Sequence, residues 1–338
     1  MSSEPRTAVI GAGSWGTALA NLLAKKGVDT LLWSHEPEVA RTINAERRNT
    51  RYLEAVELDP SLRATPDLAE ALAGAGVVLS VSPSHVVREV MGRAAPHLRP
   101  DALVVSASKG IENESLKTMD QVLADVLPAE AMRTATYLSG PSFALEVALE
   151  HPTAVTIASY SLEAARRAQE LFQTPYFRVY TSPDVPGVEL GGSLKNVVAI
   201  AAGIVEGLGY GNNTRAALIT RGLAELIRLG TALGADPRTL AGLAGMGDLI
   251  LTCTGALSRN RSVGVELGRG RPLEEILGGM VMVAEGVRTA RSARDLARRM
   301  GIEMPIVEGV HSILFEGVSP RRALEALMLR EPKAEQWG

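Results

Sequence analysis

The chain has 338 residues, of which 35 are Lys or Arg and 38 are Asp or Glu, so its formal net charge is −3. This balance argues against a broad cationic surface for nucleic acid. The length predicts about two domains, and the single cysteine, Cys253, excludes an internal disulfide. A chain that carries only a free thiol is typical of a reducing compartment, and we expect the cytoplasm.

Neither the N-terminus nor the most apolar later stretch indicates export or a membrane span. The opening MSSEPRTAVIG lacks the basic region and apolar run of a signal peptide. The most apolar later stretch, VVAIAAGIV at 197–205, is shorter than the roughly 18 residues that a membrane span needs. It predicts a buried helix, and we expect no membrane insertion.

The first half alternates short β-rich runs with helical patterns such as TALANLLAKKG and SHVVREVMGRAAPHL. This alternation predicts a parallel sheet covered by crossover helices, which is an α/β doubly wound fold of the Rossmann type over residues 1–185. The predicted strands are TAVIG (7–11), TLLW (30–33), VVLSVS (77–82), ALVVSAS (102–108), TAVTIAS (153–159) and FRVYTS (177–182).

Beyond that boundary the strand signal disappears. Pro237, Pro305 and Pro320 each stand just inside a predicted helix start, where the missing N–H costs nothing. The helices expected there are RTLAGLAG (238–245), IVEGVHSILFEG (306–317) and RRALEALMLR (321–330). We predict an all-α C-terminal substrate-binding and dimerisation domain over residues 186–338.

The string GAGSWG at 11–16 follows the first strand and opens a helix, which is the setting of a dinucleotide-binding loop. Gly11 would permit the tight turn, Gly13 would let a pyrophosphate approach the backbone, and Gly16 would let helix and strand pack closely. The helix N-terminus would then offer N–H groups to the phosphates. The alternative is a glycine-rich turn without a ligand.

The end of the second strand decides less about the cofactor. An acidic residue for a ribose hydroxyl is expected about twenty residues after the loop. The sequence there is Trp33-Ser34-His35, with Glu36 one place later. This leaves both NADP and NAD open, with His35 as a candidate neighbour of a phosphate or adenine, whereas Glu36 favours NAD.

Three later strand ends carry polar clusters, at 82–84, 106–110 and 139–143. Ligands of open α/β sheets gather at the carboxyl ends of strands, so we expect these clusters to meet there. Lys109 is the cation among them. Helix caps and turns are the alternative, since Ser, Pro and Gly also serve there.

Lys195 is the most informative single residue, because an almost entirely apolar helical stretch follows it. A buried ammonium is unfavourable unless it is paired, and a desolvated lysine can act as a general base. The alternative is a structural ion pair with Glu189 or Asp248.

The stretch GMGDLILTCTGALSRNRSVG adds polar groups in a second place. Asp248 and Thr252 would share a helix face, and the fork of Arg259 with the amide of Asn260 suits phosphate oxygens. An ordinary polar loop is the alternative. The five histidines show no metal-ligand spacing, and no G-x-S-x-G elbow indicates a hydrolase, so we expect no metal.

Six blocks together resemble one family: GAGSWGTALA, SVSPSHV, SASKGIE, SGPSFALEV, GSLKNVVAIAAGI and GDLILTCTGALSRNR. They are collinear, from about residue 8 to 317, and are similar to bacterial NAD(P)-dependent glycerol-3-phosphate dehydrogenase. The resemblance implies a Rossmann domain followed by a helical substrate domain, usually in a homodimer. It also implies a small phosphorylated substrate and supply of the phospholipid backbone precursor.

The resemblance also implies residue roles. Lys195 would be the proton acceptor for the secondary hydroxyl of sn-glycerol 3-phosphate while the hydride passes to the nicotinamide. The substrate would contact Lys109, Gly140, Ser142, Lys195, Asp248, Ser258, Arg259 and Asn260, and we add Thr252 from its place beside Asp248. The cofactor would contact Ser14, Trp15, His35, Lys109, Ala144, Arg259, Val283 and Glu285. Many members of the family have a basic residue near Glu36, which makes NADPH preference less secure here.

Two other functions remain open from the sequence. One is a related β-hydroxyacid or imine reductase, which also pairs a Rossmann domain with a lysine-bearing helical domain. The other is a non-catalytic redox sensor that binds a nucleotide and signals through its helical domain.

Overall fold

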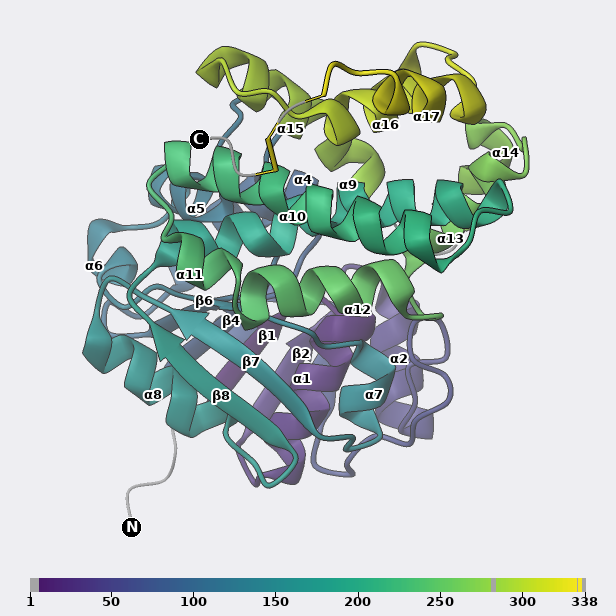
Figure 1. Cartoon of the computed structure of the whole chain (residues 1–338). Coiled ribbons are helices and arrows are strands. Elements are labelled where there is room, and N and C mark those ends of the chain that lie inside the picture. Colours follow the sequence, from purple (N-terminus) through teal and green to yellow (C-terminus); the bar gives the residue numbers. More distant parts are fainter. Residues whose placement is uncertain (1–5, 281–283, 333, 336–338) are drawn as a thin grey trace. The chain divides into compact units, whose positions relative to one another are not determined.

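The computed structural model describes residues 6–280, 284–332 and 334–335 (Figure 1). The chain divides into two compact units, which we describe separately. Unit 1 consists of residues 1–109 and 117–188, and unit 2 of residues 110–116 and 189–338. The division lies three residues beyond the predicted boundary, and the sequence patterns did not indicate that a short internal segment joins unit 2.

Unit 1 is built on an eight-stranded sheet with the strand order β3-β2-β1-β4-β5-β6-β7-β8 (Figure 1). Adjacent strands from β3 through β6 are parallel, as the predicted doubly wound fold requires. The strands are β1 (Thr7–Ile10), β2 (Thr30–Trp33), β3 (Arg63–Thr65), β4 (Val77–Ser80), β5 (Leu103–Ser106), β6 (Thr136–Ser139), β7 (Thr153–Ala158) and β8 (Phe177–Ser182).

Every residue of the central strands β1, β4 and β5 is buried, because helices cover both faces of a parallel sheet. The helical segments of unit 1 are α1 (Ser14–Lys25), α2 (Pro37–Glu46), α3 (Leu68–Leu72), α4 (Ser84–Ala94), the 3-10 turn η1 (Ala95–His97), α5 (Met119–Val126), α6 (Ala129–Met132), α7 (Ala144–Ala148) and α8 (Leu162–Phe172).

Two features of the sheet differ from the prediction. The edge strand β3 was not expected, since three residues are too few to show a hydrophobic period. The predicted parallel sheet is interrupted at β7, which runs antiparallel to β6. A parallel return usually contains a full crossover helix, whereas the connection between these strands contains only the five-residue α7.

Unit 2 is helical in its described part, as predicted. Pro237, Pro305 and Pro320 stand at the first turns of their helices. The segments are α9 (Val185–Gly207), which begins in unit 1, α10 (Asn212–Ala232), α11 (Pro237–Leu240), the π-helical turn η2 (Leu243–Gly247), α12 (Asp248–Thr254), α13 (Arg259–Gly268), α14 (Leu273–Gly278), α15 (Glu285–Met300), α16 (Pro305–Phe315) and α17 (Pro320–Met328).

The expected single helix over RTLAGLAG is wrong, because α11 ends at Leu240 and a π-helical turn follows. The reason is the close approach of Gly245 to the preceding turn. A Cβ at Gly245 would lie 1.9 Å from the carbonyl oxygen of Leu240, so the backbone folds tightly there.

Helix α9 is the centre of unit 2. It is long and apolar enough to cross a membrane, but 94% of that stretch is buried inside the protein, which is typical of a core helix. Glycines let α13 approach it: a Cβ at Gly203 or Gly264 would lie 2.0 Å from a carbonyl oxygen of the other helix. The two backbones therefore pack in direct contact.

Candidate functional site

The glycine loop joins β1 to α1 in unit 1, and its three glycines have different reasons to be glycine. Gly11 has φ +122°, a left-handed conformation that side chains rarely adopt. A Cβ at Gly16 would lie 1.9 Å from the carbonyl oxygen of Gly11. A Cβ at Gly13 would meet no described atom within 4 Å. Packing therefore requires two of the glycines, whereas Gly13 faces open space.

This arrangement fits a dinucleotide pyrophosphate. Gly13 is the N-cap of α1 and has no side chain with which to cap the helix. The first turn of a helix carries N–H groups without intrahelical partners and the positive end of the helix dipole. A bare N-cap that faces open space lets a phosphate group approach these N–H groups closely.

Neighbouring side chains hold the loop in place. The amide of Asn49, which is fully buried, donates to the carbonyl of Ala12 and to the hydroxyl of Thr17, both at 2.8 Å. Ser14 donates to the carbonyl of Tyr52 at 2.7 Å. The indole nitrogen of Trp15 is buried and has no hydrogen-bond partner among the described residues. It is a donor that a bound ligand could satisfy.

At the end of β2, His35 is exposed and its ring meets that of Trp33 edge-on, with centroids 6.1 Å apart. The Glu36 carboxylate accepts a hydrogen bond from the Tyr52 hydroxyl at 2.7 Å. Burial raises the pKa of Tyr52 above its ordinary value, and its bond to Glu36 adds to the rise. The guanidinium of Arg51 lies 5.3 Å from the centre of the Tyr52 ring. Glu36 is therefore already engaged by a neighbouring residue.

The three polar clusters lie at the carboxyl ends of β4, β5 and β6, as predicted for this edge of the sheet. Ser108 donates to the carbonyl of Ser82 at 2.6 Å, which links the first two clusters. The ammonium of Lys109 lies 3.5 Å from the carbonyl of Gly140, and Ser142 donates to the same carbonyl at 3.0 Å. Helix α7 begins at Ala144, immediately beyond this cluster.

Gly140 is required at this edge by its backbone. Its φ is +148°, and a Cβ there would lie 2.9 Å from the Cα of Val155 on the neighbouring strand β7. The carbonyl that Lys109 and Ser142 share is therefore held at a position that no other residue type reaches without strain.

In unit 2, the ammonium of Lys195 forms an ion pair with the carboxylate of Asp248, and their side chains are 8% and 2% exposed. Lys195 lies in the middle of α9, not at its start as expected. One turn earlier, a Cβ at Gly191 would lie 2.6 Å from the carbonyl of Ala244. This contact brings the start of α12, and Asp248 with it, against α9.

The predicted helical face of Asp248 and Thr252 is present in α12. The Thr252 hydroxyl lies 2.6 Å from the Asp248 carbonyl and 3.4 Å from a carboxylate oxygen. Cys253 follows Thr252 in α12 and is buried, and burial raises the pKa of its thiol to about 12, with Lys195 opposing the rise and Asp248 adding to it. The thiol therefore stays protonated at neutral pH.

Asn260 lies within the helix packing. Its amide nitrogen donates to the side-chain oxygen of Asn196 at 3.0 Å, and its amide oxygen accepts from the backbone N–H of Gly286 at 2.9 Å. These bonds connect α9, α13 and α15 next to Lys195. Both ends of the amide are thus occupied inside the protein, and Asn260 is suited to holding the helices in register.

Ser258 and Arg259 open helix α13. Ser258 is the N-cap, and its hydroxyl accepts from the N–H of Arg261 at 3.2 Å. Arg259 is the first residue of the helix and is exposed to solvent. Its guanidinium stays charged at neutral pH. A guanidinium at a helix N-terminus suits a phosphate group.

The predicted residues therefore form two sets on different units. The first set is the glycine loop with Ser14, Trp15, His35, Lys109, Gly140, Ser142 and Ala144. The second set is Lys195, Asp248, Thr252, Ser258, Arg259, Asn260 and Glu285. Val283 lies outside the described residues. No group of three or more His, Cys, Asp or Glu side chains in the described ranges could hold a metal ion.

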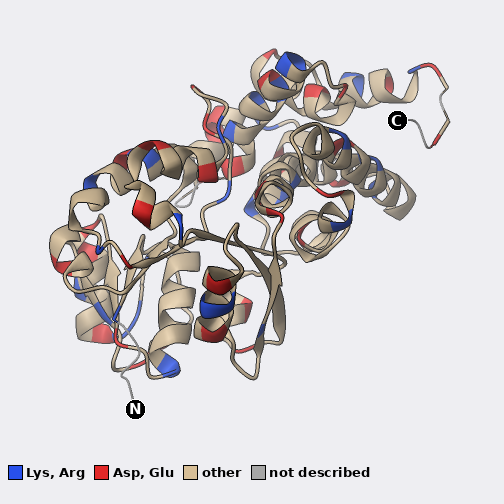
Figure 2. Cartoon of the chain, turned by 90° about the vertical axis from the view of Figure 1, so that its left-hand side faces the viewer, with Lys and Arg blue, Asp and Glu red and all other residues tan. Residues whose placement is uncertain are grey.

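The view in Figure 2 shows Lys and Arg interleaved with Asp and Glu along the helices of each unit. Neither unit therefore shows a broad surface of one charge sign in this view, and any anion site must be formed by local groups.

Three supporting residues had no sequence signal strong enough to select them: Asn49, Tyr52 and Asn196. Each is a polar residue in a short loop or an apolar helix, and its partner lies 16 to 64 positions away in the sequence. Of the three, Asn196 could have been suspected from the sequence, because an amide in an apolar helix must find a hydrogen-bond partner.

Comparison with known proteins identifies the family. The family model for the N-terminus of NAD-dependent glycerol-3-phosphate dehydrogenase matches residues 6–165, and the model for its C-terminus matches residues 184–325. The glycerol-3-phosphate dehydrogenase (NAD(P)+) of Geobacter metallireducens is 61% identical over 328 residues, which cover 97% of this chain and 98% of that protein. The protein of the same name from Geobacter sulfurreducens is 59% identical over 332 residues, with 98% and 99% covered.

A solved structure agrees with these matches. The crystal structure of glycerol-3-phosphate dehydrogenase from Coxiella burnetii has a TM-score of 0.92 and 41% identity, and it covers 97% of this chain and 99% of that chain. The chain therefore belongs to the NAD-dependent glycerol-3-phosphate dehydrogenase family.

Proposed function

We propose that this chain interconverts sn-glycerol 3-phosphate and dihydroxyacetone phosphate, with Lys195 as the group that moves the proton. Its family consists of NAD(P)-dependent oxidoreductases, and the matches extend over nearly its whole length. The observation that carries the residue assignment is the buried Lys195–Asp248 pair. A buried ammonium that is paired with a carboxylate is suited to proton transfer in a site from which water is excluded.

NAD(P), when bound, supplies or accepts the hydride at the secondary carbon of the substrate. Lys195 takes the proton from the hydroxyl on that carbon during oxidation. In the reverse direction its ammonium returns a proton to the ketone oxygen. Asp248 holds the Lys195 side chain in one orientation and balances its charge, while Thr252 orients the Asp248 carboxylate.

Residues of unit 1 hold the cofactor in this proposal. Gly13 and the first turn of α1 bind the pyrophosphate, Trp15 offers its buried indole N–H, and His35 lies where the adenosine end would bind. Lys109, Gly140 and Ser142 contribute to the polar edge that receives the substrate. Glu36, which is bonded to Tyr52, is the residue that decides between NAD and NADP.

Arg259 anchors the substrate phosphate, supported by the N-terminus of α13. Binding energy at this phosphate positions the reacting carbon, so glycerol without a phosphate should be a poor substrate. We assign Ser258 and Asn260 a supporting role, since one caps α13 and the other bonds to Asn196 and Gly286.

We further propose that the chain acts in the cytoplasm as a homodimer and supplies the backbone precursor of glycerophospholipids. Cys253 is the single cysteine of the chain and is a buried free thiol, which suits a reducing compartment. Light scattering of the purified chain tests the dimer.

The decisive experiment compares the wild type with Lys195→Met by initial rates with dihydroxyacetone phosphate and either NADPH or NADH. We expect turnover by the wild type, and a kcat lower by about 10²–10⁴-fold in the variant, because the proton donor is lost. NADPH binding, followed by its fluorescence, should persist. Lys117→Met, at a partly exposed lysine that pairs with Asp125, is the control and should keep its rate. An undiminished rate in Lys195→Met would rule out the assignment.

A further inference from the structure

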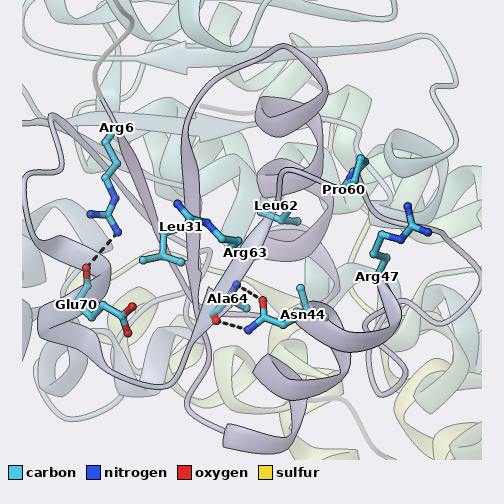
Figure 3. A pocket seen from close by; sticks show the side chains of 10 residues that line it. Arg6, Leu31, Asn44, Arg47, Pro60, Leu62, Arg63, Ala64 and Glu70 are labelled. Carbon is cyan, nitrogen blue, oxygen red and sulfur yellow. Dashed lines mark hydrogen bonds between the residues drawn. The ribbon is translucent and has the colours of Figure 1, made fainter.

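Unit 1 contains a polar cavity of about 370 Å³ whose lining includes no residue of the glycine loop (Figure 3). Arg6, Arg47 and Arg63 line it from three different segments, together with the carboxylate of Glu70. We propose that this cavity binds the phosphate group of a small molecule. It would be a further anion site, in addition to the proposed sites for the cofactor pyrophosphate and the substrate phosphate.

The cavity lies at the amino ends of the strands, whereas the glycine loop lies at the carboxyl end of β1. Arg6 directly precedes β1, whereas Gly11 directly follows it, and β1 has four residues. A parallel strand rises about 3.3 Å per residue, so these two positions, five residues apart, lie about 16 Å apart along the strand. Arg63 likewise begins β3, and its register partner Leu31 lies near the start of β2. Open α/β sheets bind their dinucleotide at the carboxyl ends of the strands, so this cavity is not the dinucleotide site.

Arg6 lies in the wall of the cavity and has one side-chain donor without a partner among the described residues. One terminal nitrogen donates to the carbonyl of Ala73 at 2.8 Å and the other to the carbonyl of Glu70 at 3.3 Å. These bonds fix the guanidinium against the end of α3. Its third nitrogen, Nε, is buried and has no hydrogen-bond partner among the described residues. Buried donors are normally satisfied, so an acceptor is missing here.

Arg47 and Arg63 are held even more loosely. Arg47 lies 3.7 Å from Glu57, and Arg63 lies 3.8 Å from Asp29. Both distances are too long for hydrogen bonds, and neither guanidinium donates one within the described part of the chain. Each guanidinium carries five N–H donors in a planar fork that matches phosphate oxygens.

The backbone at Arg47 adds an independent observation. Arg47 ends α2 with φ 52° and ψ 38°, in the left-handed region. Glycine or asparagine normally occupies this position, because a side chain is strained there. A strained arginine at the rim of a cavity is the kind of outlier that points to a function.

Hydrogen bonds and buried apolar residues fix the floor of the cavity. Asn44 of α2 bonds to both backbone groups of Ala64 at 2.8 Å, which closes the edge of the sheet at β3 (Figure 3). Leu31, Ile43 and Leu62 are buried beneath the arginines. In Figure 3 the Arg63 side chain lies between those of Arg6 and Arg47. The volume is within the range of small-molecule sites.

The test is calorimetric titration of the full-length chain with inorganic phosphate. It is carried out in an Arg259→Ala background, so that the proposed substrate anchor does not contribute. We expect binding to persist in this background and to weaken at least tenfold when Arg47→Ala and Arg63→Ala are added, because two charge-assisted contacts are lost. The two side chains are 55% and 70% exposed, so the fold should tolerate their removal, and a thermal melt checks this.

The matched control is Arg41→Ala on α2, the helix that Arg47 caps; Arg41 is 70% exposed, as is Arg63, but it lies outside the cavity. It should leave phosphate binding unchanged. Equal binding by the double variant and its parent, or equal losses in the double variant and in Arg41→Ala, would overturn the proposal. Neither result would affect the reaction assigned to Lys195, because that assignment is read from kcat with dihydroxyacetone phosphate.

Discussion

The two units place their polar groups in opposite ways. In unit 1 the candidate groups lie at the strand ends, as backbone N–H groups, glycines and partly exposed side chains. In unit 2 most of them are side chains inside the helix packing, although Arg259 is exposed. The buried Lys, Asp and Glu residues of the described structure are Lys195, Glu225 and Asp248, and all three belong to unit 2. Helix interiors satisfy their own backbone, so a helical unit must use side chains to do chemistry.

The two sites are therefore stabilised in different ways. The glycine loop needs only a turn and a helix end, so a short local motif specifies it. The Lys195–Asp248 pair needs two helices at one distance, and that distance depends on glycine contacts such as Gly191 against Ala244. Mutations should therefore act locally on function in unit 1 and through packing in unit 2.

The largest effect on stability is expected for Gly264→Ala in unit 2. Its Cβ would lie 2.0 Å from the carbonyl oxygen of Ile200, so α13 would have to move away from α9. We expect a loss of about 3 kcal/mol in the free energy of unfolding, measured in urea, at the upper end for overpacked cores. Gly278→Ala is the control, because a Cβ there meets no described atom within 4 Å. Equal stability of the two variants would contradict the tight crossing.

Glu225 predicts a pH dependence of unit 2. Its carboxylate accepts from the N–H groups of Ile306 and Val307 at 2.8 and 3.3 Å, and burial raises its pKa from 4.5 to about 7. Between these two values the unfolded chain ionises while the folded chain keeps the proton. Stability should therefore fall with rising pH across this window, by up to about 3 kcal/mol.

Glu225→Gln should remove this slope, and urea unfolding at pH 5, 6 and 7 measures it. The exposed Glu325 on α17 provides the control Glu325→Gln, which should keep the slope of the wild type. If the slopes of wild type and Glu225→Gln coincide, the carboxyl is not protonated in the folded protein.

Arg259→Ala tests the exposed end of the unit 2 set. The loss of a charge-assisted contact to phosphate should raise the KM for dihydroxyacetone phosphate about 10–100-fold, because such a contact is worth about 1.5–3 kcal/mol. The matched control is Arg269→Ala, at the exposed C-terminal end of α13. An unchanged KM in the Arg259 variant would remove the phosphate anchor from the proposal.

Gly13→Ala is the most selective test of unit 1. Its φ of −67° is allowed for alanine, and the new Cβ meets no described atom within 4 Å, so the melting temperature should not change. The methyl group would occupy the space that the pyrophosphate needs, and the KM for NADPH should rise about tenfold. Gly16→Ala, whose Cβ overlaps the Gly11 carbonyl, should lose stability instead. A loss of stability in Gly13→Ala would show that packing, not the cofactor, requires this glycine.

The sequence was sufficient for the elements with strong local signals. The buried strands β1, β2, β4 and β5 showed as apolar runs, and the starts of α11, α16 and α17 showed as prolines. The glycine loop was recognisable because strand, glycines and helix follow one another directly. Lys195 was selected because a charge before an apolar helix must be paired or functional.

The sequence was insufficient where the signal was short or distant. The strand β3 has three residues, and the direction of β7 depends on how far α7 carries the chain. The same applies to Asn260, whose side-chain amide suggested a phosphate contact. Its partners Asn196 and Gly286 lie 64 and 26 positions away, and only packing shows that they occupy its amide.

The sequence by itself therefore determined the order of the two folds, the glycine loop and the candidate lysine Lys195, because each depends on residues adjacent along the chain. The tertiary structure alone decided that Asp248 is the partner of Lys195, that Gly13 faces open space while Gly11 and Gly16 do not, and that three arginines line one cavity. These facts depend on distances between segments that are remote in the sequence. Helix crossings and strand pairing set those distances, whereas composition and hydrophobic periodicity do not encode them.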